Sequence, residues 1–152
     1  MSLVIRKATA ADCGRVAELA GQLGYPMEQA TARARITLLG TSAERALVVA
    51  ERDGRDAQII GWLEFEVHES FLSGSVGEIA ALVVDADARR SGAGRALVAW
   101  AEEATLAHGI TRLRVRSNST RIEPVSFYPA LGFREVKLAR VFEKTLASSQ
   151  LR

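Results

Sequence analysis

One segment constrains the fold more than any other: an apolar strand, a short charged turn and a helix start that contains glycine. Residues 79–84 are all apolar, and Gly92 and Gly94 open a stretch with helical spacing that reaches about His108. Because glycine has no Cβ, these two positions let backbone N–H groups approach a ligand closely. The first N–H groups of a helix also lack intrahelical partners and carry partial positive charge. The segment therefore predicts a strand–turn–helix unit that can bind an anion.

Three arginines extend this prediction to phosphate. Arg89 and Arg90 precede the glycines, and Arg95 lies in the first turn of the expected helix. Together with the helix start, these cations form a seat for a phosphate-bearing cofactor. The alternative is an ordinary helix start with an arginine pair on the surface.

Two other glycine-rich phosphate motifs fit this segment poorly. A P-loop requires a lysine after its last glycine, and no lysine follows Gly94. A dinucleotide fingerprint requires a third glycine, where Leu97 stands, and an acidic residue about 20 positions further on. Arg112 and Arg114 occupy that later region instead.

The length and composition indicate one soluble domain. The chain has 152 residues and a mass of 16.4 kDa, and most domains have roughly 100–150 residues. We expect this domain to cover residues 1–146, followed by a polar tail at 147–152. With 48% hydrophobic and 25% charged residues, the composition is that of a globular protein. The net charge of +2 does not indicate a nucleic-acid partner, because such proteins usually carry a concentrated basic face.

The few cysteines and histidines bear on compartment and metal content. A single cysteine, Cys13, cannot form an internal disulfide, which favours a reducing compartment. His68 and His108 lie far apart without ligand spacing, so we expect no structural metal. Neither a signal-peptide pattern nor a run of about 18 apolar residues is visible. We therefore expect a soluble cytoplasmic protein with no membrane partner.

The spacing of apolar and turn residues predicts an α/β (α+β) protein with a mixed, mostly antiparallel sheet flanked by helices, in the order β-α-α-β-β-β-α-β-α-β(-β). Strands are expected at Leu3–Arg6, Ala46–Ala50, Ile59–Val67, Glu78–Val84 and Thr111–Arg116, with two closing strands in Phe133–Leu146. Helices are expected at about 9–24, 26–40, Gly92–His108 and Pro124–Leu131. Gly74 and Gly77 are expected in a loop before the fourth strand.

Two motifs in these segments carry a family resemblance. The first is Arg89-Arg90-Ser91-Gly92-Ala93-Gly94, and the second is Asn118 followed by Phe127-Tyr128-Pro129-Ala130-Leu131-Gly132-Phe133. They resemble the acetyl-CoA signature and the asparagine–FYxxxGF element of the GCN5-related N-acetyltransferase (GNAT) superfamily. Both motifs lie in the family's order on the expected elements, and the resemblance covers most of the chain.

The resemblance implies acetyl-CoA as cofactor, held at one splayed edge of the sheet. The strand backbone before the turn would pair with the pantetheine arm, and the amides from Arg90 to Arg95 would hold the pyrophosphate. Asn118 would hydrogen-bond the arm, although it also suits an ordinary turn. The implied cofactor-binding residues are Leu82, Val83, Val84, Arg89, Arg90, Ser91, Gly92, Ala93, Gly94, Arg95, Asn118 and Tyr128.

The resemblance also implies catalytic roles for Tyr128 and Glu78. Tyr128 would give a proton to the departing thiolate, and a phenol pKa near ~10 and a thiol pKa near ~8.5 make this exchange reasonable. Glu78 lies 11 positions before Arg89 and would accept the proton of the amine. The alternatives are a tyrosine that anchors a short helix and a solvated glutamate. Pro129 requires that this helix begin near Ser126 or that it be kinked.

Glu64, Glu66 and His68 lie on the neighbouring strand, where they would line an acceptor pocket or form a solvated face. The region 20–40, the loop at 68–77 and the closing strands would complete that pocket. We expect an N-acetyltransferase that acts directly on a primary amine of a small molecule or peptide. The alternatives are a non-catalytic acyl-CoA-binding module and a protein lysine or N-terminal acetyltransferase. The resemblance also makes a homodimer through the final strands plausible.

Overall fold

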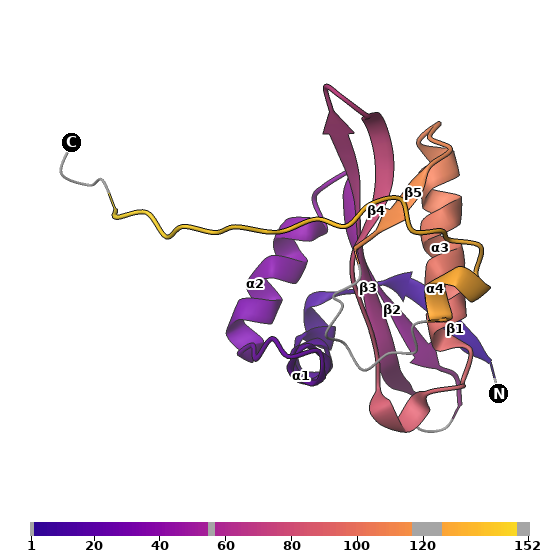
Figure 1. The fold of residues 1–152 in the computed structure, drawn as a ribbon. Coiled ribbons are helices and arrows are strands. Elements are labelled where there is room, and N and C mark those ends of the chain that lie inside the picture. Colours follow the sequence, from indigo (N-terminus) through magenta and orange to yellow (C-terminus); the bar gives the residue numbers. More distant parts are fainter. Residues whose placement is uncertain (1, 55–56, 117–125, 149–152) are drawn as a thin grey trace. The chain divides into compact units, whose positions relative to one another are not determined.

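The computed structural model describes residues 2–54, 57–116 and 126–148, in two compact units, Met1–Ser119 and Thr120–Arg152. The first unit contains a five-stranded sheet with helices on both faces (Figure 1). This is the α/β arrangement that the sequence predicts. The predicted extent of a single domain, residues 1–146, stays a prediction.

The sheet is mixed and mostly antiparallel, as predicted. Its strands are β1 (Leu3–Lys7), β2 (Arg45–Arg52), β3 (Gln58–Ser70), β4 (Gly74–Val84) and β5 (Leu113–Val115). They lie side by side in chain order, with antiparallel pairing from β1 to β4 and a parallel pair between β4 and β5. The long β3–β4 hairpin brings residues of the two central strands opposite one another.

The expected loop around Gly74 and Gly77 is wrong, because both glycines belong to β4. At Gly77 the reason for glycine is close packing against a helix. A Cβ at this position would lie 2.2 Å from the Thr105 hydroxyl oxygen, much closer than a real contact permits. Gly77 therefore lets a helix approach the sheet, a requirement that the sequence pattern does not distinguish from a turn.

The helices of the first unit follow the predicted spacing. They are α1 (Cys13–Gln22), α2 (Gln29–Leu39) and α3 (Ala93–Ala107), with short 3-10 turns at Ala10–Asp12 and Ala86–Ala88. Before α1, the Asp12 carboxylate accepts a hydrogen bond from the Thr9 backbone N–H at 2.7 Å. Gly24 and Gly109 follow α1 and α3 in the left-handed conformation typical of helix ends. No helix among the described residues has the length and apolar character needed to cross a membrane.

Each face of the sheet is covered by different helices. Trp62 lies in a buried cluster with residues of α1 and α2, and its indole N–H donates to the Val16 carbonyl at 3.2 Å. On the α3 side, the rings of Phe65 and Trp100 meet edge to face with centroids 5.8 Å apart. Because side chains alternate along a strand, Trp62, Glu64 and Glu66 share the α1–α2 side of β3.

The second unit contains the short helix α4 (Phe127–Ala130). Ser126 precedes the helix, so Pro129 falls within its first turn, where a missing N–H is tolerated. This is one of the two alternatives that the sequence predicts. The Tyr128 ring packs edge to face against Phe127 and Phe133, with centroids 4.9 and 5.7 Å away.

The two closing strands predicted in Phe133–Leu146 are wrong. The described residues after α4 contain no strand, although their alternating pattern is typical of one. A strand is defined by pairing with a neighbour, and no such pairing is present among the described residues of this segment. The sequence pattern records the alternation but not the presence of a neighbour.

Candidate functional site

The site begins at the edge of the sheet, where β4 and β5 part. Only Gly77–Ile79 of β4 pair with Leu113–Val115 of β5, and β4 then continues to Val84. Leu82, Val83 and Val84 pair with β3 on one side, and no described residue pairs with them on the other. This half of β4 therefore presents a free backbone edge, as the predicted splayed sheet requires.

A bulge separates the two halves of β4. Glu64 of β3 lies opposite Ala81 and the next residue, Phe65, lies opposite Ile79, so Ala80 has no partner on β3. An extra residue in one strand bends it and increases its twist. The bulge therefore lies where the half paired with β5 gives way to the half with a free edge.

Asp85 fixes the turn that follows β4. Its carboxylate accepts hydrogen bonds from the Asp87 backbone N–H at 3.1 Å and from the Gln22 side chain at 3.2 Å. It also forms an ion pair with Arg15 of α1. The backbone hydrogen bond of Asp87 and the side chains of Arg15 and Gln22 lower the pKa of Asp85 below its ordinary value. The turn is thereby tied to α1.

The following loop has an unusual backbone. Arg90 and Gly92 adopt φ angles of 69° and 87°, in the left-handed region that glycine adopts without a steric penalty. Gly92 precedes α3, and the Ser91 hydroxyl accepts a hydrogen bond from the Ala93 backbone N–H at 3.2 Å. The backbone amide of Gly94 then lies in the first turn of α3, where N–H groups have no intrahelical acceptor. The loop thus leads directly into a helix start whose first N–H groups have no intrahelical acceptor.

The three predicted arginines surround this helix start. Arg89, Arg90 and Arg95 are exposed, and none forms a hydrogen bond or ion pair with another residue that the structure describes. Free guanidinium groups beside unpaired helix amides favour an anion such as a pyrophosphate. This arrangement suits a cofactor seat of the kind that the sequence predicts, and the assignment of these residues to the cofactor stays a prediction.

Glu78 lies in the paired half of β4 and is nearly inaccessible, with 4% of its surface exposed. The Arg116 side chain, just after β5, donates a hydrogen bond to the Glu78 carboxylate at 2.8 Å. Arg116 itself is largely exposed, so it neutralises the buried carboxylate from the solvent side. The solvated glutamate considered as an alternative is therefore excluded for Glu78.

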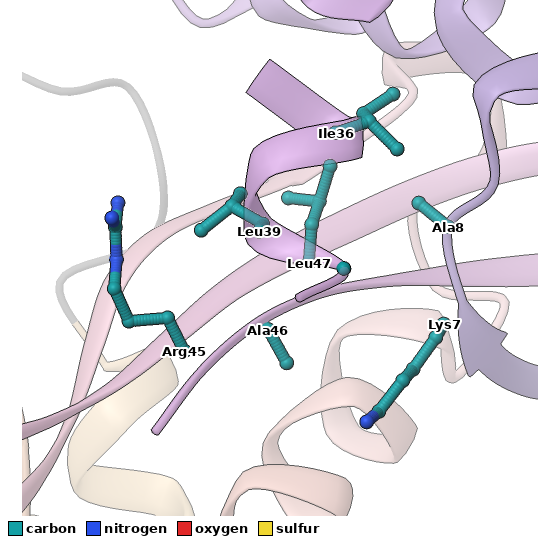
Figure 2. A pocket seen from close by; sticks show the side chains of 8 residues that line it. Lys7, Ala8, Ile36, Leu39, Arg45, Ala46 and Leu47 are labelled. Atoms are coloured by element: carbon teal, nitrogen blue, oxygen red, sulfur yellow. The ribbon is translucent and has the colours of Figure 1, made fainter. Parts of the chain in front are cut away.

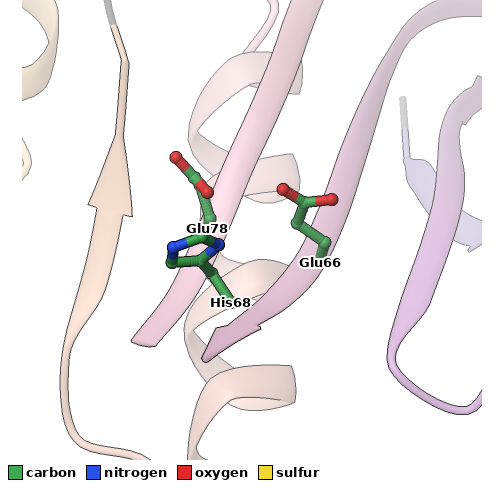
Figure 3. Close-up of side chains that lie close together, drawn as sticks. All are labelled: Glu66, His68 and Glu78. Atoms are coloured by element: carbon green, nitrogen blue, oxygen red, sulfur yellow. The ribbon is translucent and has the colours of Figure 1, made fainter. Parts of the chain in front are cut away.

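Two further side chains meet Glu78 across the β3–β4 hairpin. Glu66 lies directly opposite Glu78, and the nearest ligand atoms of Glu66, His68 and Glu78 all lie within 4.8 Å of one another (Figure 3). Burial, followed by the charges of Glu78 and Glu64, raises the pKa of Glu66 above its ordinary value. Two carboxylates and an imidazole are thereby brought together beside Arg116.

Three such side chains also form a grouping that can bind a metal ion. Arg116 already supplies positive charge to Glu78 at this point, which reduces the attraction of the group for a cation. The absence of a metal stays a prediction from the sequence.

A pocket of about 400 Å³ opens between α1, α2 and the sheet. Most of its lining is apolar, and its charged members are two arginines and one glutamate. The lining residues are Val16, Met27, Ala32, Arg35, Ile36, Leu38, Leu39, Arg45, Leu47, Trp62 and Glu64. It lies on the side of β3 that carries Glu64 and Glu66.

A second space of about 20 Å³ adjoins the larger pocket and shares Ile36, Leu39, Arg45 and Leu47 with it (Figure 2). Its size suits a single water molecule. Arg45 reaches from β2 toward β3, with its guanidinium 3.5 Å from the Glu64 carboxylate and 4.0 Å from that of Glu66. Arg45 therefore links the pocket to the carboxylates around Glu78.

The profile of the acetyltransferase (GNAT) family matches residues 4–133. The chain belongs to this family. The expected membership and fold are therefore confirmed, and the match spans the free edge of β4, the α3 start and the Tyr128 segment. None of the curated protein sequences compared with this chain matches it.

Solved structures similar to this family member share its fold at low sequence identity. The aminoglycoside N-acetyltransferase AAC(6')-Iy is 17% identical with a TM-score of 0.81, over 96% of this chain and 100% of that chain. AAC(6')-Ih from Acinetobacter baumannii is 21% identical with a TM-score of 0.80, over 96% and 100%. Glucosamine-6-phosphate N-acetyltransferase from Arabidopsis thaliana is 20% identical with a TM-score of 0.76, over 94% and 100%.

The remaining site predictions for this GNAT chain have different outcomes. Asn118 lies outside the described residues, and Tyr128 belongs to the second unit, so their roles stay predictions. Arg116 and Arg45 were missed as partners of the carboxylates. For Arg116 the alternating arginines of 112–116 are a usable signal, because every second residue of a strand faces the same way. For Arg45 no sequence signal distinguishes it from other arginines at a strand start.

Proposed function

We propose that this GNAT protein transfers the acetyl group of acetyl-CoA directly to a primary amine of a small molecule or peptide. The observation that carries the proposal is the free edge of β4 beside the start of α3. There a strand edge without a described partner, a left-handed loop and three arginines without ion pairs lie consecutively along residues 82–95. An extended, amide-bearing arm that ends in a pyrophosphate matches both parts of this surface.

The cofactor would be held mainly by backbone groups. Leu82, Val83 and Val84 would pair with the amide-bearing arm, and the amides from Arg90 to Arg95 would bind the pyrophosphate. Arg89 would add charge, and Asn118 and Tyr128 would contact the arm. In support, the AAC(6')-Iy structure contains a bisubstrate analog that includes CoA.

The chemistry requires a neutral amine and an activated acetyl group. Acetyl-CoA supplies a thioester whose C–S bond breaks as the new C–N bond forms. Glu78 would accept the proton that the amine loses, directly or through a water molecule. Its burial and the hydrogen bond from Arg116 hold the carboxylate in one position. Tyr128 would donate a proton to the sulfur of the leaving group.

A titration calorimetry experiment with acetyl-CoA tests the cofactor part of the proposal. The wild-type protein is expected to bind acetyl-CoA, and the Arg89→Ala/Arg95→Ala double variant is expected to bind it at least tenfold more weakly. Arg33→Ala is the matched control, because Arg33 is an exposed arginine of α2 away from the α3 start. No heat with the wild-type protein at millimolar acetyl-CoA contradicts the proposal.

The transfer step needs a separate measurement, because a non-catalytic module would also bind acetyl-CoA. CoA release in the presence of a panel of primary amines distinguishes the two functions. Tyr128→Phe is expected to lower turnover while acetyl-CoA affinity stays similar. Unchanged turnover removes Tyr128 from the mechanism, and binding without acetylation of any amine favours the non-catalytic alternative.

A further inference from the structure

The pocket between α1, α2 and the sheet indicates which amine this site accepts. Resting on the acetyl transfer proposed above, we infer that the acceptor is a primary amine on an apolar body that also carries an oxyanion such as a carboxylate. The inference combines the apolar walls of the pocket, its two arginines and the carboxylates of Glu64, Glu66 and Glu78 on the same side of the sheet.

The walls are suited to an apolar body. Trp62 and Ile36 are buried at the base, whereas Met27 and Leu39 are half-buried and Leu38 is 65% exposed. Covering this exposed apolar surface is favourable at roughly 25 cal/mol per Å². A volume of about 400 Å³ accommodates a small molecule of amino-acid size.

The charges of the pocket favour an anionic group. Arg35 is exposed and forms no hydrogen bond or ion pair with any residue in the described ranges. Arg45 is shared between Glu64 and Glu66 at 3.5 and 4.0 Å. An oxyanion can pair bidentately with the free Arg35 guanidinium. A polycation would instead bring further positive charge against the unpaired Arg35.

Carboxylates on the same side of β3 would determine where the amine of the acceptor lies. Glu64 lines the pocket, Glu66 follows two residues later on the same face, and Glu66 lies opposite Glu78. Carboxylates attract the ammonium form of an amine, and Glu78 can then take its proton. The acceptor would therefore lie with its amine toward Glu78 and its oxyanion toward Arg35.

The inferred acceptor of this chain differs from the acceptors named for two structures of similar fold. AAC(6')-Iy and AAC(6')-Ih are aminoglycoside N-acetyltransferases. The identities of 17% and 21% leave the acceptor pocket free to differ. A pocket with apolar walls and two arginines favours a different acceptor on the same scaffold.

The test uses purified full-length protein, saturating acetyl-CoA and matched amines, with CoA release and product mass as readouts. Leucine and 6-aminohexanoate carry an apolar body and a carboxylate. Isoamylamine and hexylamine are their counterparts without the carboxylate. Glucosamine 6-phosphate is a polar anionic amine, and neamine is a polycation. We expect leucine or 6-aminohexanoate to have a kcat/KM at least tenfold above all four comparison amines.

The variant Arg35→Ala tests the pairing directly. It is expected to raise KM for the preferred carboxylate-bearing amine about tenfold, and to raise KM for its uncharged counterpart much less. The control Arg33→Ala, two residues away on α2, is expected to change neither. The uncharged amine also reports whether the variant is folded and active.

The outcomes separate this inference from the proposed function. If acetyl-CoA binds but neamine, glucosamine 6-phosphate or an uncharged amine is preferred, the inference is overturned and acetyl transfer stands. Acetyl-CoA binding without acetylation of leucine or 6-aminohexanoate also overturns it. An equal effect of Arg35→Ala on charged and uncharged amines overturns the pairing. Failure to bind acetyl-CoA overturns the proposed function itself.

Discussion

The two halves of β4 differ in what lies beside them. The first half, up to Ile79, pairs with β3 and, at Gly77–Ile79, also with β5, and it holds the buried Glu78 against Arg116. The second half, from Ala81 to Val84, is paired only with β3 among the described residues and presents a free backbone edge. In the proposed function, one strand would therefore offer a side chain to the amine and a main chain to acetyl-CoA, with the Ala80 bulge between them.

Replacing the carboxylate of the first half is expected to have the largest effect. Glu78→Gln removes a proton acceptor while it keeps the shape of the side chain, so kcat/KM should fall by roughly 10²–10⁴-fold. Acetyl-CoA affinity should stay unchanged, because the second half of β4 is untouched. Glu69→Gln, an exposed glutamate of β3, is the control. A comparable loss in both variants, or a loss of acetyl-CoA binding, contradicts the division between the halves.

The packing of α3 on the first half is expected to be the next most sensitive feature. Gly77→Ala places a methyl group against Thr105 and should lower the free energy of unfolding by about 1–3 kcal/mol. Gly21→Ala on α1 has open space around it and should stabilise the protein by about 0.5–1 kcal/mol. Urea unfolding measures both. Equal effects of the two substitutions contradict the close approach of α3.

Removing the charged partner of Glu78 tests the role of the first half of β4 in turnover. Arg116→Gln leaves the buried carboxylate without its charged donor and should lower kcat/KM roughly 10- to 100-fold, in line with about 1.5–3 kcal/mol for a hydrogen bond to a charged group. Arg116→Lys should restore much of the rate, because it returns the positive charge. Loss of acetyl-CoA affinity in place of turnover is the result that argues against this assignment.

The smallest effects are opposite pH dependences of stability. Glu66 faces the first half, and its raised pKa means that the folded state binds more protons than the unfolded state above about pH 4.5. Wild-type stability should therefore fall relative to Glu66→Gln as the pH rises past that value. Asp85 follows the second half, and its lowered pKa contributes stability that is lost as the pH falls below 3.8.

Thermal or urea unfolding of Glu66→Gln and Asp85→Asn across pH 3–8 measures these differences against the wild-type protein. For Asp85→Asn, the wild-type advantage should be present at neutral pH and shrink in acid. Slopes of the same sign for the two variants contradict the assigned interactions.

The local features of the site were predictable from the sequence because they depend on residues close together in the chain. The glycine at 92 predicted a helix start, and the structure has a left-handed Gly92 immediately before α3. The place of the arginines at 89, 90 and 95 was predictable because they lie within a few residues of that start. Pro129 likewise restricted α4 to two alternatives, one of which is confirmed.

The features that depend on pairing between strands were not predictable. Glu66 and His68 approach Glu78 only because of the β3–β4 register, which the bulge at Ala80 shifts by one residue. Alternation alone also predicted strands in 133–146, where the described chain has none. Alternation fixes which residues share a face, but it does not specify the neighbouring strand.

Hydrogen exchange with and without acetyl-CoA tests the central claim most directly, because it reports backbone protection along β4. Acetyl-CoA should slow exchange in residues 81–84 and 90–95, the free edge and the α3 start, and leave residues 74–79 nearly unchanged. Bound acetyl-CoA that protects 74–79 or another region, with no change at 81–84 and 90–95, would contradict the account.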